Sequence, residues 1–165
     1  MKKVLLGAAI MLSVGLIVSR SAHAPTATTT LDVSATADPV CTVFTTPVDF
    51  GQYDDTNGNV ATGDITVTCP LDVSYDITLD QGQHYSGYRH VSDGLHWLTY
   101  ILWDPGHSYE WGDSGYGNTY PNGSSVSDVG DGTPQSHIVN AELLPEQGPV
   151  PDGIYSDTVA VTVYY

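Results

Sequence analysis

In the segment Gly112-Asp113-Ser114-Gly115, the neighbours of Ser114 are like those of a nucleophilic serine in some hydrolases. A serine nucleophile also needs a base that takes its proton and an acid that orients the base. The sequence offers no identifiable base for Ser114, and the hydrolase pattern Gly-x-Ser-x-Gly does not occur. We therefore predict that the protein is not an enzyme.

Possible metal ligands are present, but their spacing is unfavourable. Residues 55–59, Asp-Thr-Asn-Gly-Asn, alternate oxygen ligands as a calcium loop does, yet the loop's sixth-position glycine and closing glutamate are missing. A turn explains this segment better. Asp128 and Asp131 could hold a cation only weakly. No histidine pair has metal-ligand spacing among His84, His90, His96, His107 and His137. We predict no metal and no other cofactor.

Five aromatic residues lie among glycines and asparagines and could form a flat surface on which sugar rings stack. They are Tyr85, Tyr88, Trp111, Tyr116 and Tyr120. Packing of these rings over the end of a β-sandwich is the more common arrangement. A secreted carbohydrate-binding module is therefore one candidate function.

The first residues have the pattern of a secretory signal peptide. Lys2 and Lys3 precede an apolar run over residues 4–18, which is shorter than the roughly 20 residues of a membrane span. Small residues follow, so we expect a signal peptide over residues 1–24, cleaved after Ser21 or Ala24. The mature chain should carry no membrane span and should be exported.

Removal of this segment leaves Arg89 as the only lysine or arginine against 19 acidic residues, a formal charge of about −18. Such a surface repels nucleic acid and anionic lipid. Export also places Cys41 and Cys69, the two cysteines, in an oxidising compartment, where we expect a disulfide between them. Closing this loop should stabilise the fold by roughly 3 to 4 kcal/mol.

Alternating apolar residues predict short strands along the remaining single domain. Segments 40–44, 47–51, 65–69, 73–79 and 138–144 have this pattern, and residues 95–103 are apolar on both faces, as in a central strand or one that covers a contact surface. Residues 104–135 are rich in turn formers and predict long loops or short hairpins. No window after the signal peptide predicts a helix. The fold class is all-β, an antiparallel sandwich.

The last strand and an early segment complement each other. Thr158–Tyr165 alternates, with Val159, Val161, Val163 and Tyr165 on one face, and no later residues could pair with its free side. Residues 31–37 alternate too, yet precede the first cysteine. A sheet that lacks a strand, together with a spare strand, suggests subunits that complete each other.

Several short segments, in order, resemble the spore coat protein U domain, a family that includes subunits of archaic chaperone-usher pili. The matching segments are residues 41–43, 47–53, 63–69, 75–80, 87–89, 98–104, 111–113 and 153–159. The resemblance implies an incomplete immunoglobulin-like sandwich over residues 39–165, exported through the periplasm. It also implies an N-terminal donor-strand extension over residues 25–38, and it makes Trp111-Gly112-Asp113 a family feature rather than part of a hydrolytic site around Ser114.

In such a polymer a periplasmic chaperone lends a strand to the open groove, and an outer-membrane usher exchanges it for the extension of the next subunit. The expected donor side chains are Leu31, Val33, Ala35 and Ala37, and the expected partners are other pilus subunits at the cell surface, in adhesion or biofilm formation. Alternatives with the same fold are a spore coat or extracellular matrix protein. A monomeric carbohydrate-binding module also remains.

Overall fold

The computed structural model describes residues 27–114, 116–117, 120 and 122–165. The chain divides into two units, Met1–Thr36 and Ala37–Tyr165. In the first unit, residues 27–36 form no helix or strand. The side chains of Leu31 and Val33 are exposed, at 86% and 85%. No helix within the described residues is both long and apolar enough to span a bilayer.

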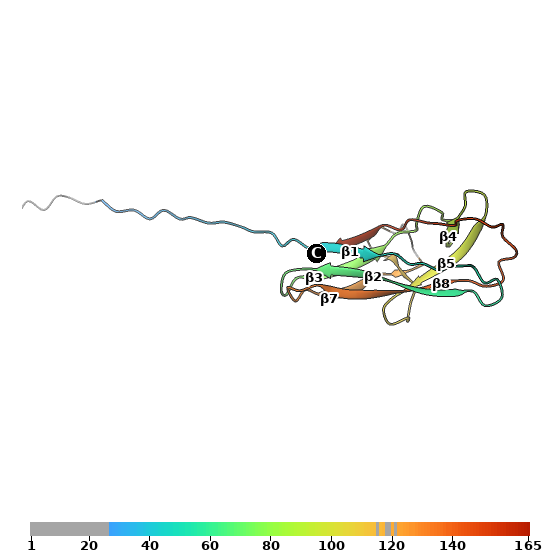
Figure 1. Ribbon diagram of the computed structural model, residues 1–165. Coiled ribbons are helices and arrows are strands. Elements are labelled where there is room, and N and C mark those ends of the chain that lie inside the picture. The colour runs from blue at the N-terminus through green and yellow to red at the C-terminus, as the bar shows by residue number, and fades with distance from the viewer. Residues whose placement is uncertain (1–26, 115, 118–119, 121) are drawn as a thin grey trace, which may run out of the picture. The chain divides into compact units, whose positions relative to one another are not determined.

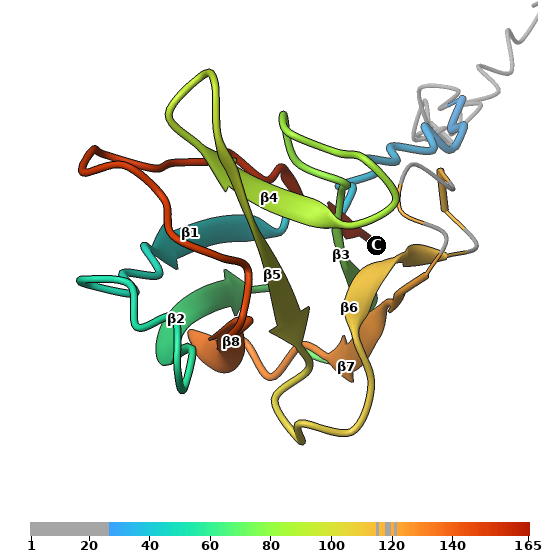
Figure 2. The same cartoon turned by 90° about the vertical axis from the view of Figure 1, so that its right-hand side faces the viewer.

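The second unit is a sandwich of two antiparallel sheets. The strands are β1 (Thr42–Thr46), β2 (Asn59–Thr68), β3 (Ser74–Leu79), β4 (Arg89–Ser92), β5 (Trp97–Trp103), β6 (Trp111–Ser114), β7 (Val126–Val129), β8 (Gln135–Leu143) and β9 (Val161–Tyr164) (Figure 1). One sheet has the order β1-β2-β8-β5-β4 and the other β7-β3-β9. The two layers are visible in Figure 2, where β3 and β7 lie apart from the five strands of the larger sheet. The all-β, antiparallel, immunoglobulin-like prediction is confirmed.

The core fills the space between the sheets because alternate residues of each strand point inward. The larger sheet contributes Ile65 and Val67 from β2, Leu98 and Leu102 from β5, and Val139 from β8. The smaller sheet contributes Tyr75, Ile77 and Leu79 from β3 and Val126 from β7. Trp111 from β6 is also buried in this core. Strand alternation thus produces one contiguous core.

The predicted disulfide between Cys41 and Cys69 is present, with the two Cα atoms 4.3 Å apart. It joins neighbouring strands of the larger sheet, because Cys41 precedes β1 and Cys69 follows β2, whose residues Thr42 and Thr68 are paired. Cys69 is buried.

Several strand boundaries differ from the sequence predictions. The segment predicted over 40–44 begins and ends two residues later, as β1, and residues 47–51 form no strand. The last strand is also shorter than predicted, since only Val161–Tyr164 pairs with β3. Residues before it bond individually instead, and Ala160 donates its N–H to Asp80 Oδ1 at 2.8 Å. Strand β4 was not predicted, because it is short and polar.

Candidate functional site

A groove opens between the two sheets where each has an edge strand. Strand β1 pairs only with β2, and β9 pairs only with β3, among the described residues. All five residues of β1 are exposed, including Val43, at 45%, which pairs with the inward-facing Val67. A complete sandwich would cover such an inward side chain. The groove is therefore a gap in the core rather than a surface irregularity.

The floor of the groove consists of core side chains. They come from strands β2, β3, β5 and β8 and are Ile65, Leu79, Leu98, Tyr100, Leu102, Val139 and Leu143. Residues 45–55 form one wall, residues 148–159 with Val161 form the other, and the cavity measures about 1030 Å³. Apolar floors with free main-chain edges on both sides suit an extended peptide segment.

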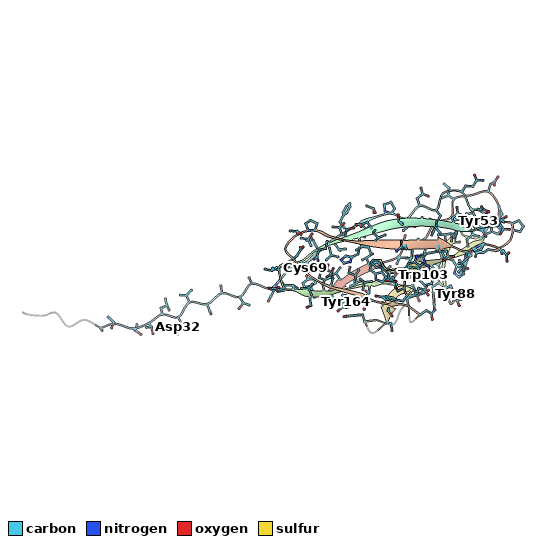
Figure 3. The ribbon with its side chains drawn as sticks, turned by 90° about the horizontal axis from the view of Figure 1, so that it is seen from below. Asp32, Tyr53, Cys69, Tyr88, Trp103 and Tyr164 are labelled. Carbon is cyan, nitrogen blue, oxygen red and sulfur yellow. A yellow bond between two sulfur atoms is a disulfide. The ribbon has the colours of Figure 1, made fainter. Side chains whose placement is uncertain are left out.

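One end of the groove is held by Tyr53, which Figure 3 places at the opposite end of the sandwich from Cys69. The Tyr53 hydroxyl lies 3.2 Å from Leu144 O and 3.1 Å from Asp55 Oδ1, and it accepts the N–H of Gln147 at 3.3 Å. Burial raises the pKa of Tyr53, so the phenol keeps its proton. In the same cluster Asp55 Oδ1 accepts the N–H of Gly148 at 3.0 Å, which links the two walls.

Asp157 anchors the second wall near its C-terminal end. Its side chain is 3% exposed, and its carboxylate accepts the Tyr100 hydroxyl at 2.6 Å and the N–H of Gln83 at 2.9 Å. It also accepts the N–H of His84 at 3.2 Å. Burial raises the pKa of Tyr100, and the Asp157 carboxylate adds to the effect, which keeps this phenol a donor. The wall thus lacks regular strand structure over residues 148–160 yet is firmly attached to the core.

The predicted acceptor residues lie as their alternation requires. Val159, Val161 and Val163 are half-buried and pack against the core, whereas Thr158, Ala160 and Thr162 are exposed. Val159 and Val161 line the groove. Tyr165 follows β9 and is 57% exposed. The role of these residues in accepting a strand stays a prediction, as does the donor role of Leu31, Val33, Ala35 and Ala37.

The five loop aromatics that were considered as a sugar-binding surface do not form one as a set. Trp111 and Tyr120 are fully buried, and the Trp111 indole donates to Ile77 O at 3.0 Å. The Tyr120 ring instead stacks over the Arg89 guanidinium, 3.9 Å from ring centroid to Cζ. Both rings therefore pack the sandwich, which was the alternative explanation for this sequence pattern.

The other sequence candidates have structural roles. Ser114 ends β6, and its N–H donates to Gly123 O at 3.2 Å. Asp54 and Asn59 organise the predicted turn, since Asp54 Oδ1 accepts the N–H of Thr56 at 2.9 Å and Asn59 Oδ1 accepts that of Asp54 at 2.8 Å. Within the described ranges, no three His, Cys, Asp or Glu residues are arranged to hold a metal ion.

Sequence reasoning missed the anchors of the groove walls. Asp157 and Tyr100 are 57 residues apart, and Tyr53 and Leu144 are 91 apart, so no local pattern connects them. The segment Ser156-Asp157-Thr158 alternates like a strand, and only the fold shows that its acidic member points inward.

Comparison with known proteins identifies a family and a similar fold. The family model described as Spore Coat Protein U domain matches residues 27–162. Among solved structures, the fold is similar to a chain of the crystal structure of the CsuC–CsuE chaperone–tip adhesion subunit pre-assembly complex from archaic chaperone-usher Csu pili of Acinetobacter baumannii, with a TM-score of 0.56 and 20% sequence identity. The alignment covers 77% of this chain and 40% of that chain. No curated protein matches the sequence.

Proposed function

The chain belongs to the spore coat protein U domain family, and from this premise we propose that it is a structural subunit of an exported chaperone-usher polymer. The observation that carries the proposal is the open groove between β1 and β9, whose floor is the core itself. A subunit with such a gap is completed by a strand from outside. On this proposal the donor is residues 28–37 of a neighbouring subunit, and the polymer serves attachment at the cell surface.

Strand donation uses both features of the groove. The free edge of β9 offers main-chain groups to an added strand, and alternate donor side chains enter the apolar floor. Leu31, Val33, Ala35 and Ala37 share one face of an extended strand, because successive side chains point to opposite sides. The final strand, Thr158–Tyr165, is the pairing partner in this proposal.

The two larger donor side chains decide the energetics. Burying Leu31 and Val33 should contribute roughly 1.5 to 3 kcal/mol each, and each new main-chain hydrogen bond about 0.5 to 1.5 kcal/mol net. Ordering the donor costs about 1 to 2 kcal/mol per residue in backbone entropy. Ala35 and Ala37 add little apolar area, so loss of either Leu31 or Val33 should tip the balance against assembly.

The open groove also accounts for the partners that a chaperone-usher system would supply. A free subunit presents unpaired strand edges above an apolar floor, which is a template for aggregation. A periplasmic chaperone that lends a strand would protect this groove until an outer-membrane usher exchanges it. The chaperone, the usher and the cell-surface location are all parts of the proposal.

The test replaces Val33 or Leu31 with Asp and examines surface extracts on unboiled gels. Both V33D and L31D should lose the ladder of polymers but still be exported and captured by the chaperone, since the acceptor groove is untouched. Ser34→Asn, whose side chain faces outward on the same segment, is the matched control and should keep the ladder. A full ladder from V33D would contradict strand donation and favour a coat protein or a monomeric binder.

A mixing experiment separates donor from acceptor. V33D keeps an intact groove, and Val161→Asp keeps an intact extension. Purified together, the two variants should form hetero-dimers and no longer species, whereas each alone should stay monomeric. Longer polymers from the mixture would show that the groove and the extension are not the two halves of the contact.

A further inference from the structure

The outer face of the larger sheet, on the side away from the core and the groove, carries an unusual row of side chains along β5. Leu98, Tyr100 and Leu102 are buried in the core, so Trp97, Thr99, Ile101 and Trp103 point outward. These four residues keep part of their surface accessible, and Trp97 is 44% exposed. An antiparallel strand with one solvated face normally has polar residues there. The indoles therefore suggest a contact surface.

At one end of this row, Trp103 forms half of an aromatic pair. The His107 ring stacks on the Trp103 indole, with ring centroids 5.1 Å apart and an interplanar angle of 19°. His107 adopts a left-handed backbone conformation, φ 52°, which is uncommon for a residue with a side chain. The buried Asp104 carboxylate holds this loop by accepting the N–H groups of Gly106, at 2.9 Å, and Tyr109, at 2.8 Å. The exposed imidazole is thus held in place by the fold.

Beside His107 lies a depression of about 460 Å³. It is lined by Val60, Ala61, Thr62, His107, Asn140 and Ala141. This volume is in the range of small-molecule sites. Strand register places polar groups next to the apolar ones: Asn140 pairs with both Thr62 and Trp103, and Glu142 pairs with both Val60 and Ile101. The Trp103 indole N–H lies 3.3 Å from Glu142 Oε2, which holds the carboxylate beside the indole.

At the other end of the row, Trp97 lies near two imidazoles. Its ring centroid is 5.0 Å from that of His90 and 6.2 Å from that of His84. Trp97 and Trp103 are six residues apart on one strand face, a separation of about 20 Å at roughly 3.4 Å per residue. The row is therefore long enough for several sugar rings rather than for one.

We propose that this outer face of β5 binds an uncharged glycan chain, in addition to the proposed assembly through the groove. The apolar faces of the sugar rings would stack on the Trp103–His107 pair and on Trp97. Their hydroxyl groups would bond to Glu142, Asn140 and Thr99 between the two tryptophans. Carboxylates accept hydroxyl protons well, whereas the acidic surface of the chain repels nucleic acids and anionic polysaccharides.

The test titrates the exported full-length protein with cellohexaose, maltohexaose and N-acetylchitohexaose, following tryptophan fluorescence. At least one of these probes should bind, and hexagalacturonate, which is anionic, should not. Trp103→Ala and Trp97→Ala should each weaken binding about tenfold, equivalent to roughly 1.4 kcal/mol. Tyr88→Ala, at an exposed aromatic residue outside the row, is the matched control and should bind like the wild type.

The thermal transition and the disulfide confirm that each variant is folded, and His107→Ala tests the same end of the row if Trp103→Ala does not fold. Failure of all three neutral probes at millimolar concentration would overturn the proposal, as would undiminished binding by the Trp97→Ala, Trp103→Ala double variant. Self-association that the double variant abolishes would instead identify the face as a protein contact. Because the row lies outside the groove, polymer ladders should be unchanged in these variants, which separates this test from the test of strand donation.

Discussion

His137 is a titratable side chain in the core, on the inward face of β8. It is 7% exposed, and its Nε2 lies 2.9 Å from the Tyr75 hydroxyl. Burial lowers the pKa of His137 below its ordinary value of 6.5, although the Asp128 and Asp64 carboxylates act in the opposite direction. The fold therefore favours the neutral imidazole. In the unfolded chain His137 binds a proton with its ordinary affinity.

This difference predicts a loss of stability in mild acid. A lowered pKa in the folded state contributes stability above pH 6.5, and this contribution is lost as the pH falls through the folded value. The free energy of unfolding should thus decrease between about pH 7 and 5, and His137→Gln should flatten the decrease. Urea titrations at each pH measure it. Between pH 8 and 7 the free energy of unfolding should change equally with pH in the wild type and in His137→Gln. Equal changes in the two proteins below pH 7 would refute the role of His137.

The burial of Arg89 could not be predicted from its sequence context. An arginine in a short polar segment suggests an exposed loop, yet Arg89 is fully buried. Its guanidinium donates to the carbonyl oxygens of Leu79, Asp80 and Trp111. Backbone carbonyls from loops and strand ends satisfy the charge, and these become neighbours only after the chain folds.

At the scale of elements, alternation predicted the strands that face the core on one side only. Strands β3 and β8 lie close to their predicted ranges, and the apolar pattern on both faces of residues 95–103 fits β5, an inner strand of its sheet. A missing strand predicts a groove, but local sequence does not predict the floor of that groove, because four strands that are distant in sequence supply it. Trp111 and Tyr120 are buried, unlike the exposed aromatic residues, and their sequence context did not reveal this difference.

The disulfide between the start of β1 and the end of β2 closes a loop with a sequence separation of 28. Its loss should destabilise the sandwich by roughly 3 to 4 kcal/mol, because β1 is an edge strand whose exposed residues contribute little burial. Cys41→Ser should lower the urea midpoint and the exported yield. Reduction of the wild type with dithiothreitol is the matching measurement, and an unchanged midpoint in both experiments would contradict the prediction.

For the whole molecule, the charge distribution should control the rate of the proposed assembly. Without the expected signal peptide the chain has a formal charge of about −18, and two such copies repel each other over about 30 Å at 0.01 M salt but only about 8 Å at 0.15 M. Strand donation between subunits should therefore accelerate as salt is raised over this range. A synthetic peptide of residues 28–37, with Asp32 as its only charged side chain, is the control and should show a weaker response. Equal salt dependence for peptide and subunit would contradict this account.

In a filament joined by donated strands, tension would enter each subunit where the extension meets the sandwich, at Cys41. The disulfide passes this load directly to the end of β2, so the hydrogen bonds between β1 and β2 need not carry it. Strand β2 is then pulled along its length against β8, with which it is paired from Asn59 to Val67. Many hydrogen bonds share the force in this shear geometry, whereas an edge strand without the sulfur link would be peeled off one bond at a time.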